Sequence, residues 1–145
     1  MKSNYLNLFP KVDKFHAVSN AISRVAQKYG AKLDEHQQIL LALSDIFIEI
    51  YFTESAILRT LKNCDRSGEK SQLVQIAMTK AYLYEASDII AKKGKEVIIN
   101  MCKEDEQKQL LEVLYKKLQF KEYSDIIGLK TQIADKLIEE NKYCF

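Results

Sequence analysis

The chain has 145 residues, enough for one domain with a hydrophobic core. Its 22 basic and 20 acidic side chains leave a formal net charge of +2, and this balance argues against a nucleic-acid-binding protein. Hydrophobic residues make up 47%, so the chain should fold rather than remain disordered. Only 4 Gly and 1 Pro are available for turns, which predicts an all-α protein.

The N-terminal part of the chain predicts a loose leader over residues 1–10, followed by a single helical bundle domain over residues 11–145. Pro10 suits the first turn of a helix, so the first helix is expected over about residues 11–29. Gly30 suits the position just after its end. The apolar face of this helix is formed by Phe15, Val18, Ile22, Val25 and Tyr29.

A long central helix is predicted over residues 33–62, with Asp34 as its N-cap and a turn over residues 63–68 after it. One apolar stripe with helical spacing contains Leu40, Leu43, Phe47, Ile50, Ile57 and Leu61. A second stripe contains Leu41, Ile48 and Phe52. Two apolar stripes predict a helix that is covered on more than one side, as in the middle of a bundle.

Charged residues lie within this apolar run, notably Asp45, Glu54 and Arg59. Buried charges are costly unless they are paired, so we expect them to pair with a neighbouring helix or to extend to solvent. The first candidate partner of Arg59 is Glu85. The alternative is that these charges bind a ligand or a partner group. The four candidate structural or interface residues are therefore Asp45, Glu54, Arg59 and Glu85.

The second half of the chain predicts three further helices, over about residues 69–102, 104–118 and 129–141. Gly94 lies inside the first of these and indicates a break or a close helix contact. A connection over residues 120–128 separates the last two. The inward positions are expected to include Leu73, Ile76, Ala77, Leu83, Tyr84, Ile90, Val97, Ile98, Leu110, Leu111, Leu114, Tyr115, Leu118, Ile133, Leu137 and Ile138. Five helices with short loops predict an antiparallel bundle of four main helices plus one.

Known catalytic and cofactor patterns do not emerge from the sequence. Four scattered glycines cannot form a phosphate-binding loop, so no cofactor-binding residue is predicted. His16 and His36 have no Cys or His neighbour at ligand spacing, so no metal site is predicted. No activated nucleophile or paired acid stands out, so no catalytic residue is predicted and this chain alone is expected to be inactive.

The cysteines and the hydropathy pattern bear on location. Three cysteines at wide spacing (Cys64, Cys102 and Cys144) indicate a reducing compartment, and we expect a cytoplasmic protein. Residues 1–19 contain no signal-peptide pattern, and no apolar run approaches the roughly 20 residues of a membrane span. The basic cluster Lys92, Lys93 and Lys95 is the best candidate for contact with a membrane surface, but a solvated face is the favoured interpretation.

Several separated blocks resemble one enzyme family. Residues 48–60 read IEIYFTESAILRT, residues 75–78 QIAM, residues 81–86 AYLYEA and residues 132–145 QIADKLIEENKYCF. In this order they resemble the helical C-terminal extension of certain bacterial acyl-CoA dehydrogenases. The resemblance covers roughly residues 26–145 and is weakest over residues 103–127.

The resemblance implies a parent enzyme that carries FAD and its catalytic base in an upstream core. That core has no counterpart in this chain, so no cofactor is expected here and no catalytic role passes to Glu54 or Glu85. The implied role is a non-catalytic domain that packs on the upstream core, supports a homo-oligomer or contacts a partner in fatty acyl-CoA oxidation. The alternative is a free-standing helical protein-interaction module.

Overall fold

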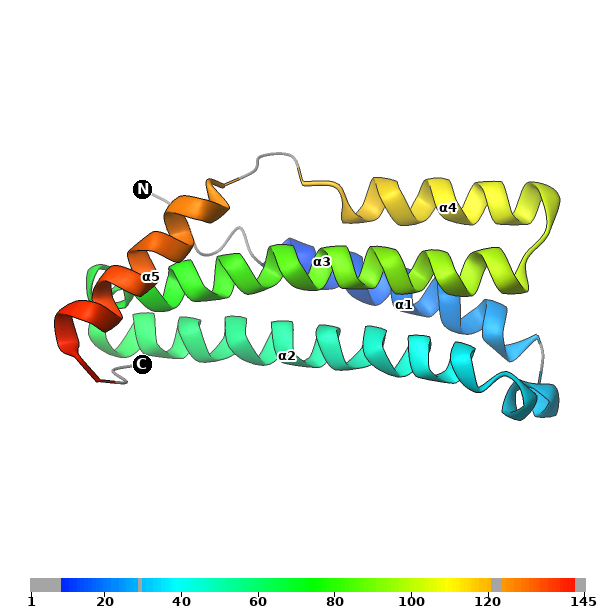
Figure 1. The fold of residues 1–145 in the computed structure, drawn as a ribbon, viewed down its shortest axis with the longest axis horizontal. Helices are drawn as coiled ribbons and strands as arrows, with labels where there is room; N and C mark the ends of the chain where they lie inside the picture. The colour runs from blue at the N-terminus through cyan, green and yellow to red at the C-terminus, as the bar shows by residue number, and fades with distance from the viewer. Residues whose placement is uncertain (1–8, 29, 121–123, 143–145) are drawn as a thin grey trace.

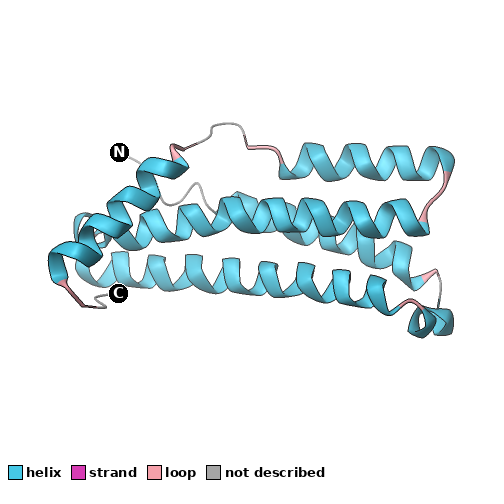
Figure 2. Ribbon diagram, in the orientation of Figure 1, coloured by secondary structure: helices cyan, strands magenta, loops and turns pink. Residues whose placement is uncertain are grey.

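The computed structural model describes residues 9–28, 30–120 and 124–142. Over these residues the regular structure is entirely helical, as predicted. The α-helices are α1 (Phe9–Gln27), α2 (Gln37–Ser67), α3 (Leu73–Met101), α4 (Glu104–Leu118) and α5 (Ile126–Glu140). Two short 3₁₀ helices, η2 (Gly30–Glu35) and η3 (Glu69–Gln72), lie on either side of α2. Figure 2 shows the helices and the short loops that join them.

Four helices run lengthwise to form an elongated bundle (Figure 1). Helix α1 contacts α2, α3 and α4, and α3 contacts all the other α-helices. Helices α2 and α4 therefore lie on opposite sides of the bundle, with α1 and α3 between them. Helix α5 crosses one end of α3 obliquely, so it is the additional helix of a bundle of four plus one.

The core takes side chains from each of the four lengthwise helices. The predicted face of α1 is correct within the described residues, since Phe15, Val18, Ile22 and Val25 are buried. Tyr29, the last residue of that face, lies outside the described residues. The core continues with Ile46 and Ile57 of α2 and with Leu114 and Leu118 of α4. Helix α3 adds six large or medium apolar residues, which are Ile76, Leu83, Ile90, Val97, Ile98 and Met101.

The predicted boundaries of the central helix were wrong at both ends. Asp34 is not its N-cap, because residues 30–35 form η2 and α2 begins at Gln37. The predicted turn over residues 63–68 is helical up to Ser67, because Cys64 is buried and extends the inward face of α2 by another turn. The break comes at Gly68, whose φ of +81° lies in the region that favours glycine.

The ends of the chain also differ from expectation. Helix α1 begins at Phe9, so it includes the last two residues of the predicted leader, and residues 1–8 lie outside the description. Helix α5 begins at Ile126 rather than near residue 129, because the Asp125 side chain caps it by accepting a hydrogen bond of 3.0 Å from the Gly128 N–H.

Several predicted inward positions are exposed. Leu73 and Tyr115 are half exposed, Leu137 is exposed and Ile138 is 77% exposed. The errors at Leu137 and Ile138 have one cause: α5 makes its main helix contact with α3, at one end of the bundle, and none of its residues is buried. Ile133, the third predicted position in α5, is half-buried as expected for a helix on the outside of the bundle.

Gly94 marks a close contact among three helices, and α3 continues through it without a break. A Cβ atom placed there would lie 2.9 Å from Cδ1 of Ile22 in α1 and 2.9 Å from Cδ1 of Leu114 in α4. A Cβ at this position would force the ends of these two buried side chains to shift, so glycine matters here for space rather than for backbone freedom. The close-packing interpretation of the sequence is confirmed.

We predict that Gly94→Val lowers the free energy of unfolding by about 1–3 kcal/mol, because the added methyl groups overpack this contact. Urea denaturation followed by circular dichroism measures the change. The matched control is Lys92→Val, which introduces the same β-branched residue at an exposed position of the same helix. The control should change stability by less than about 0.5 kcal/mol. An equal loss in both variants would contradict the close-packing account.

Candidate interaction surface

Helix α2 buries one face against α1 and α3. Its buried residues are Ile39, Ala42, Ile46, Ile50, Thr53, Ile57, Thr60 and Cys64, which recur every three or four positions. Polar contacts also join α2 to α3. The hydroxyls of Thr60 and Thr79 share a buried hydrogen bond of 2.7 Å, and the Tyr82 hydroxyl donates to Glu49 at 2.7 Å. We call this contact between the two helices the α2–α3 seam.

The prediction that α2 is covered on two sides was wrong. Of the first predicted stripe, Ile50 and Ile57 are buried, Leu40, Leu43 and Leu61 are half-buried, and Phe47 is half exposed. The second predicted stripe points to solvent throughout. The physical reason is the position of α2 at the side of the bundle, where no helix in the described part of the chain covers its far side.

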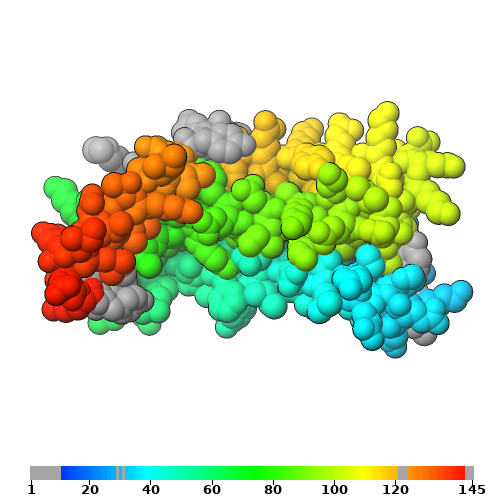
Figure 3. Space-filling view, in the orientation of Figure 1, coloured from blue at the N-terminus to red at the C-terminus, as the bar shows by residue number. Residues whose placement is uncertain are grey.

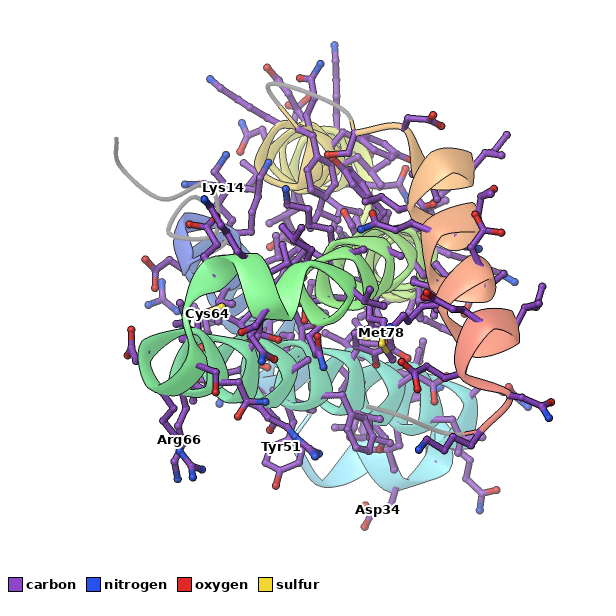
Figure 4. The ribbon with its side chains drawn as sticks, turned by 90° about the vertical axis from the view of Figure 1, so that its left-hand side faces the viewer. Lys14, Asp34, Tyr51, Cys64, Arg66 and Met78 are labelled. Carbon is purple, nitrogen blue, oxygen red and sulfur yellow. The ribbon has the colours of Figure 1, made fainter. Side chains whose placement is uncertain are left out.

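An apolar strip therefore runs along the exposed side of α2. Its members are Leu41, Phe47, Ile48, Tyr51, Phe52 and Leu58, which together we call the α2 outer face. Tyr51 is 66% exposed and Leu41 58% exposed, and the other four are about half exposed. Figure 4 shows Tyr51 pointing away from the bundle. In the space-filling view of Figure 3, α2 forms the lower edge of the molecule. The sequence analysis did not single out Tyr51 or Leu58, although both lie at helical spacing from Ile48.

Helix α4 is a useful comparison, because it lies on the opposite side of the same bundle. Its exposed positions are mostly charged or amide residues. Only two large apolar side chains of α4, Val113 and Tyr115, are exposed. A helix at the side of this bundle can therefore have a polar outer surface. The apolar α2 outer face is not a necessary result of that position, and it indicates a site of association.

Two of the four charged candidates pair at the edges of α2. The Asp45 carboxylate lies 3.0 Å from the Lys93 ammonium of α3, and this hydrogen bond raises the pKa of Lys93. The Glu54 carboxylate lies 3.6 Å from Nε2 of His16 in α1, which pairs with it when protonated. All four side chains are partly exposed, so these pairs position α2 between its neighbours and contribute modestly to stability.

The predicted pairing of Arg59 with Glu85 is wrong. Glu85 pairs with Lys130 of α5 at 2.6 Å, because α5 crosses α3 at that point. Arg59 is exposed, and no described carboxylate lies within ion-pair distance of it. The Arg59 guanidinium therefore forms no buried ion pair with a described acid. It lies at the border of the α2 outer face, where it can contact another molecule.

One lysine of the basic cluster Lys92, Lys93 and Lys95 on α3 forms ion pairs within the molecule. Lys93 contacts both Asp45 and Glu96, whereas Lys92 and Lys95 are exposed. In the described portion of the chain, no helix is long and apolar enough to cross a bilayer.

Three surface hollows among the described residues have volumes of about 620, 730 and 690 Å³. The hollow of about 730 Å³, between α3 and α4, contains Asp88 and Glu112 against one cation, Lys116. The hollow at the start of α2 contains Asp34 and Glu35, and the hollow beside α5 contains Asp125, Asp135 and Glu139 against Lys136. A diphosphate would meet net negative charge in each, so these residues do not fit FAD. No group of three or more His, Cys, Asp or Glu among the described residues could hold a metal ion.

Comparison with known proteins places this geometry in a family. Residues 21–116 match the family model described as acyl-CoA dehydrogenase, C-terminal domain. A probable acyl-CoA dehydrogenase of Bacillus subtilis (strain 168) is 32% identical over 123 residues, which are 85% of this chain and 20% of that protein. The chain is also similar to the crystal structure of an acyl-CoA dehydrogenase complexed with FAD from Bacillus anthracis, with a TM-score of 0.93 and 27% sequence identity. The match covers 100% of this chain and 25% of the chain of that enzyme. The chain thus spans a quarter or less of the length of these relatives.

The hydrogen bond between Tyr82 and Glu49 predicts a pH dependence of stability. Burial, and then the hydrogen bond to Glu49, raise the pKa of the Tyr82 hydroxyl. As the pH rises above about 10, the ordinary pKa of tyrosine, the unfolded chain loses this proton while the folded chain retains it. This contribution to stability is therefore complete below about pH 10 and is lost above it.

We predict that the free energy of unfolding falls less steeply above about pH 10 for Tyr82→Phe than for the unchanged chain. Urea denaturation at a series of pH values measures both slopes. Tyr51→Phe, which removes a hydroxyl outside the seam, serves as the control and should follow the unchanged chain. Parallel curves for Tyr82→Phe and the unchanged chain would contradict the prediction, because folding would then leave the pKa of Tyr82 unchanged.

Proposed function

Because the chain belongs to the acyl-CoA dehydrogenase C-terminal domain family, we propose that it is the non-catalytic C-terminal domain of an FAD-dependent acyl-CoA dehydrogenase. The parent enzyme would oxidise fatty acyl-CoA thioesters in the cytoplasm. FAD and the catalytic base would belong to the upstream core, which corresponds to most of the length of the relatives.

One observation carries this proposal: the chain aligns over its full length with part of an FAD-containing acyl-CoA dehydrogenase, at a TM-score of 0.93. The geometry of the bundle also supports a domain that does not itself bind the flavin. The three hollows described above are acidic and do not suit a flavin diphosphate. Among the described residues, the surface that no other helix covers is the apolar α2 outer face, and it is not a polar cleft.

The role of the domain within the parent would be association. Packing on the upstream core, dimerisation and contact with a partner protein all require an exposed apolar surface, and the α2 outer face supplies one. Charged residues at its border, such as Arg59, would give orientation to the contact.

The size of the native polypeptide tests this proposal. An antibody against α4 should detect, in a lysate of source cells, a polypeptide four to five times larger than 16.8 kDa, because the chain covers 20–25% of its relatives. The protein purified with that antibody should show a flavin absorption spectrum. A recombinant 145-residue chain is the size marker and the flavin-free control. A native band at 16.8 kDa without flavin would contradict the proposal.

A further inference from the structure

Helix α5 has no buried residue, whereas each of the four lengthwise helices contributes side chains to the core. We propose that α5 is a detachable helix, which leaves α3 as a unit while the four lengthwise helices stay folded. This opening uncovers a part of α3 that the closed form hides. It is a property of the bundle alone, so it does not depend on the proposed function.

The contact between α5 and the rest of the bundle is limited. The inward side of α5 consists mainly of Ile126, Leu129 and Ile133, which are only half-buried. Among the described residues, α5 forms one ion pair with another helix, between Lys130 and Glu85 of α3 at 2.6 Å. Both side chains of this pair are more than half exposed, and such pairs contribute little to stability. The attachment of α5 is therefore weaker than the core contacts of the other helices.

The remaining polar contacts of α5 lie within the helix itself. The Asp125 side chain caps its start, and the Thr131 hydroxyl donates to the Ile127 carbonyl at 3.0 Å. Near its end, the Lys136 ammonium lies 2.7 Å from the Glu140 carboxylate. None of these contacts needs a group from the bundle, so they can persist when α5 leaves. Detachment therefore strands no buried polar group, which would otherwise oppose it.

Detachment uncovers one line of α3. Val74 borders the hollow of about 690 Å³ beside α5, and Glu85 pairs with Lys130. Met78 and Ala81 lie between these two positions, on the same line by helical spacing. Ala81 is buried and Met78 is half-buried, and Figure 4 shows Met78 on the side of α3 toward α5. The open form therefore presents an apolar strip on α3 in addition to the α2 outer face.

Thiol labelling of the 145-residue chain under native conditions tests the opening. In a background with Cys64, Cys102 and Cys144 replaced by alanine, Ala81→Cys should react steadily with a small thiol reagent. The matched control is Ala86→Cys, the same substitution on the same helix at a position that is 0% exposed within the core. The control should react at least about 100-fold more slowly, because its exposure requires the whole bundle to unfold.

Two further substitutions show whether the attachment of α5 controls this reaction. Ile133→Ala removes a half-buried side chain from the inward side of α5, and Ile138→Ala removes the same groups from a position that is 77% exposed. Ile133→Ala should speed labelling at position 81 by about tenfold, because apolar burial on α3 is lost. It should leave labelling at position 86 unchanged. Ile138→Ala should change either rate by less than about threefold.

Two results would overturn the proposal. Equal labelling rates at positions 81 and 86 would mean that α3 is uncovered only when the whole domain unfolds. Equal effects of Ile133→Ala and Ile138→Ala would mean that the contact of α5 with α3 does not govern the opening. Circular dichroism verifies that every variant keeps the helical fold. Neither result affects the proposed function, because the size and flavin content of the native polypeptide are measured independently.

Discussion

The structure depends on the position of α2, which packs against α1 and α3 and against no helix on its far side within the described residues. Ile46 and Ile57 anchor its inward face in the core, and the α2–α3 seam adds a buried hydroxyl pair and a hydrogen bond from Tyr82. These contacts fix the rotation of α2 about its own axis. Once that rotation is fixed, Tyr51 and Ile48 must point outward, and the apolar α2 outer face follows.

This arrangement separates what holds the domain together from what it offers to other molecules. The core does not need the α2 outer face. Helices α1, α3 and α4 pack closely together where Gly94 of α3 meets the buried Leu114 of α4. Ion pairs at the borders of α2, such as Asp45 with Lys93, are partly exposed and mainly position the helix. The strip of aromatic and aliphatic residues on the far side of α2 makes little contribution to this core. It is therefore free to contact another surface.

The sequence predicted the helical class, the number of main helices and the face of α1 correctly, because the apolar spacing of α1 leaves a single choice of inward face. It failed on α2, where apolar residues occur around most of the circumference and spacing alone cannot say which line is buried. The same ambiguity led to the wrong pairing of Arg59 with Glu85, since the direction of Arg59 depends on the rotation of α2. The exposure of Ile138 depends on where α5 crosses α3, which is a tertiary property.

The central claim is that the α2 outer face is covered in the native protein. Hydroxyl-radical footprinting of the protein isolated from its source, with modification read at single tyrosines, tests this most directly. In the isolated chain Tyr51 is 66% exposed and Tyr115 50% exposed, so Tyr51 should not be the slower of the two to react. If the face is covered, Tyr51 becomes protected in the native protein while Tyr115 still reacts. Equal modification of the two tyrosines in the native protein would contradict the account.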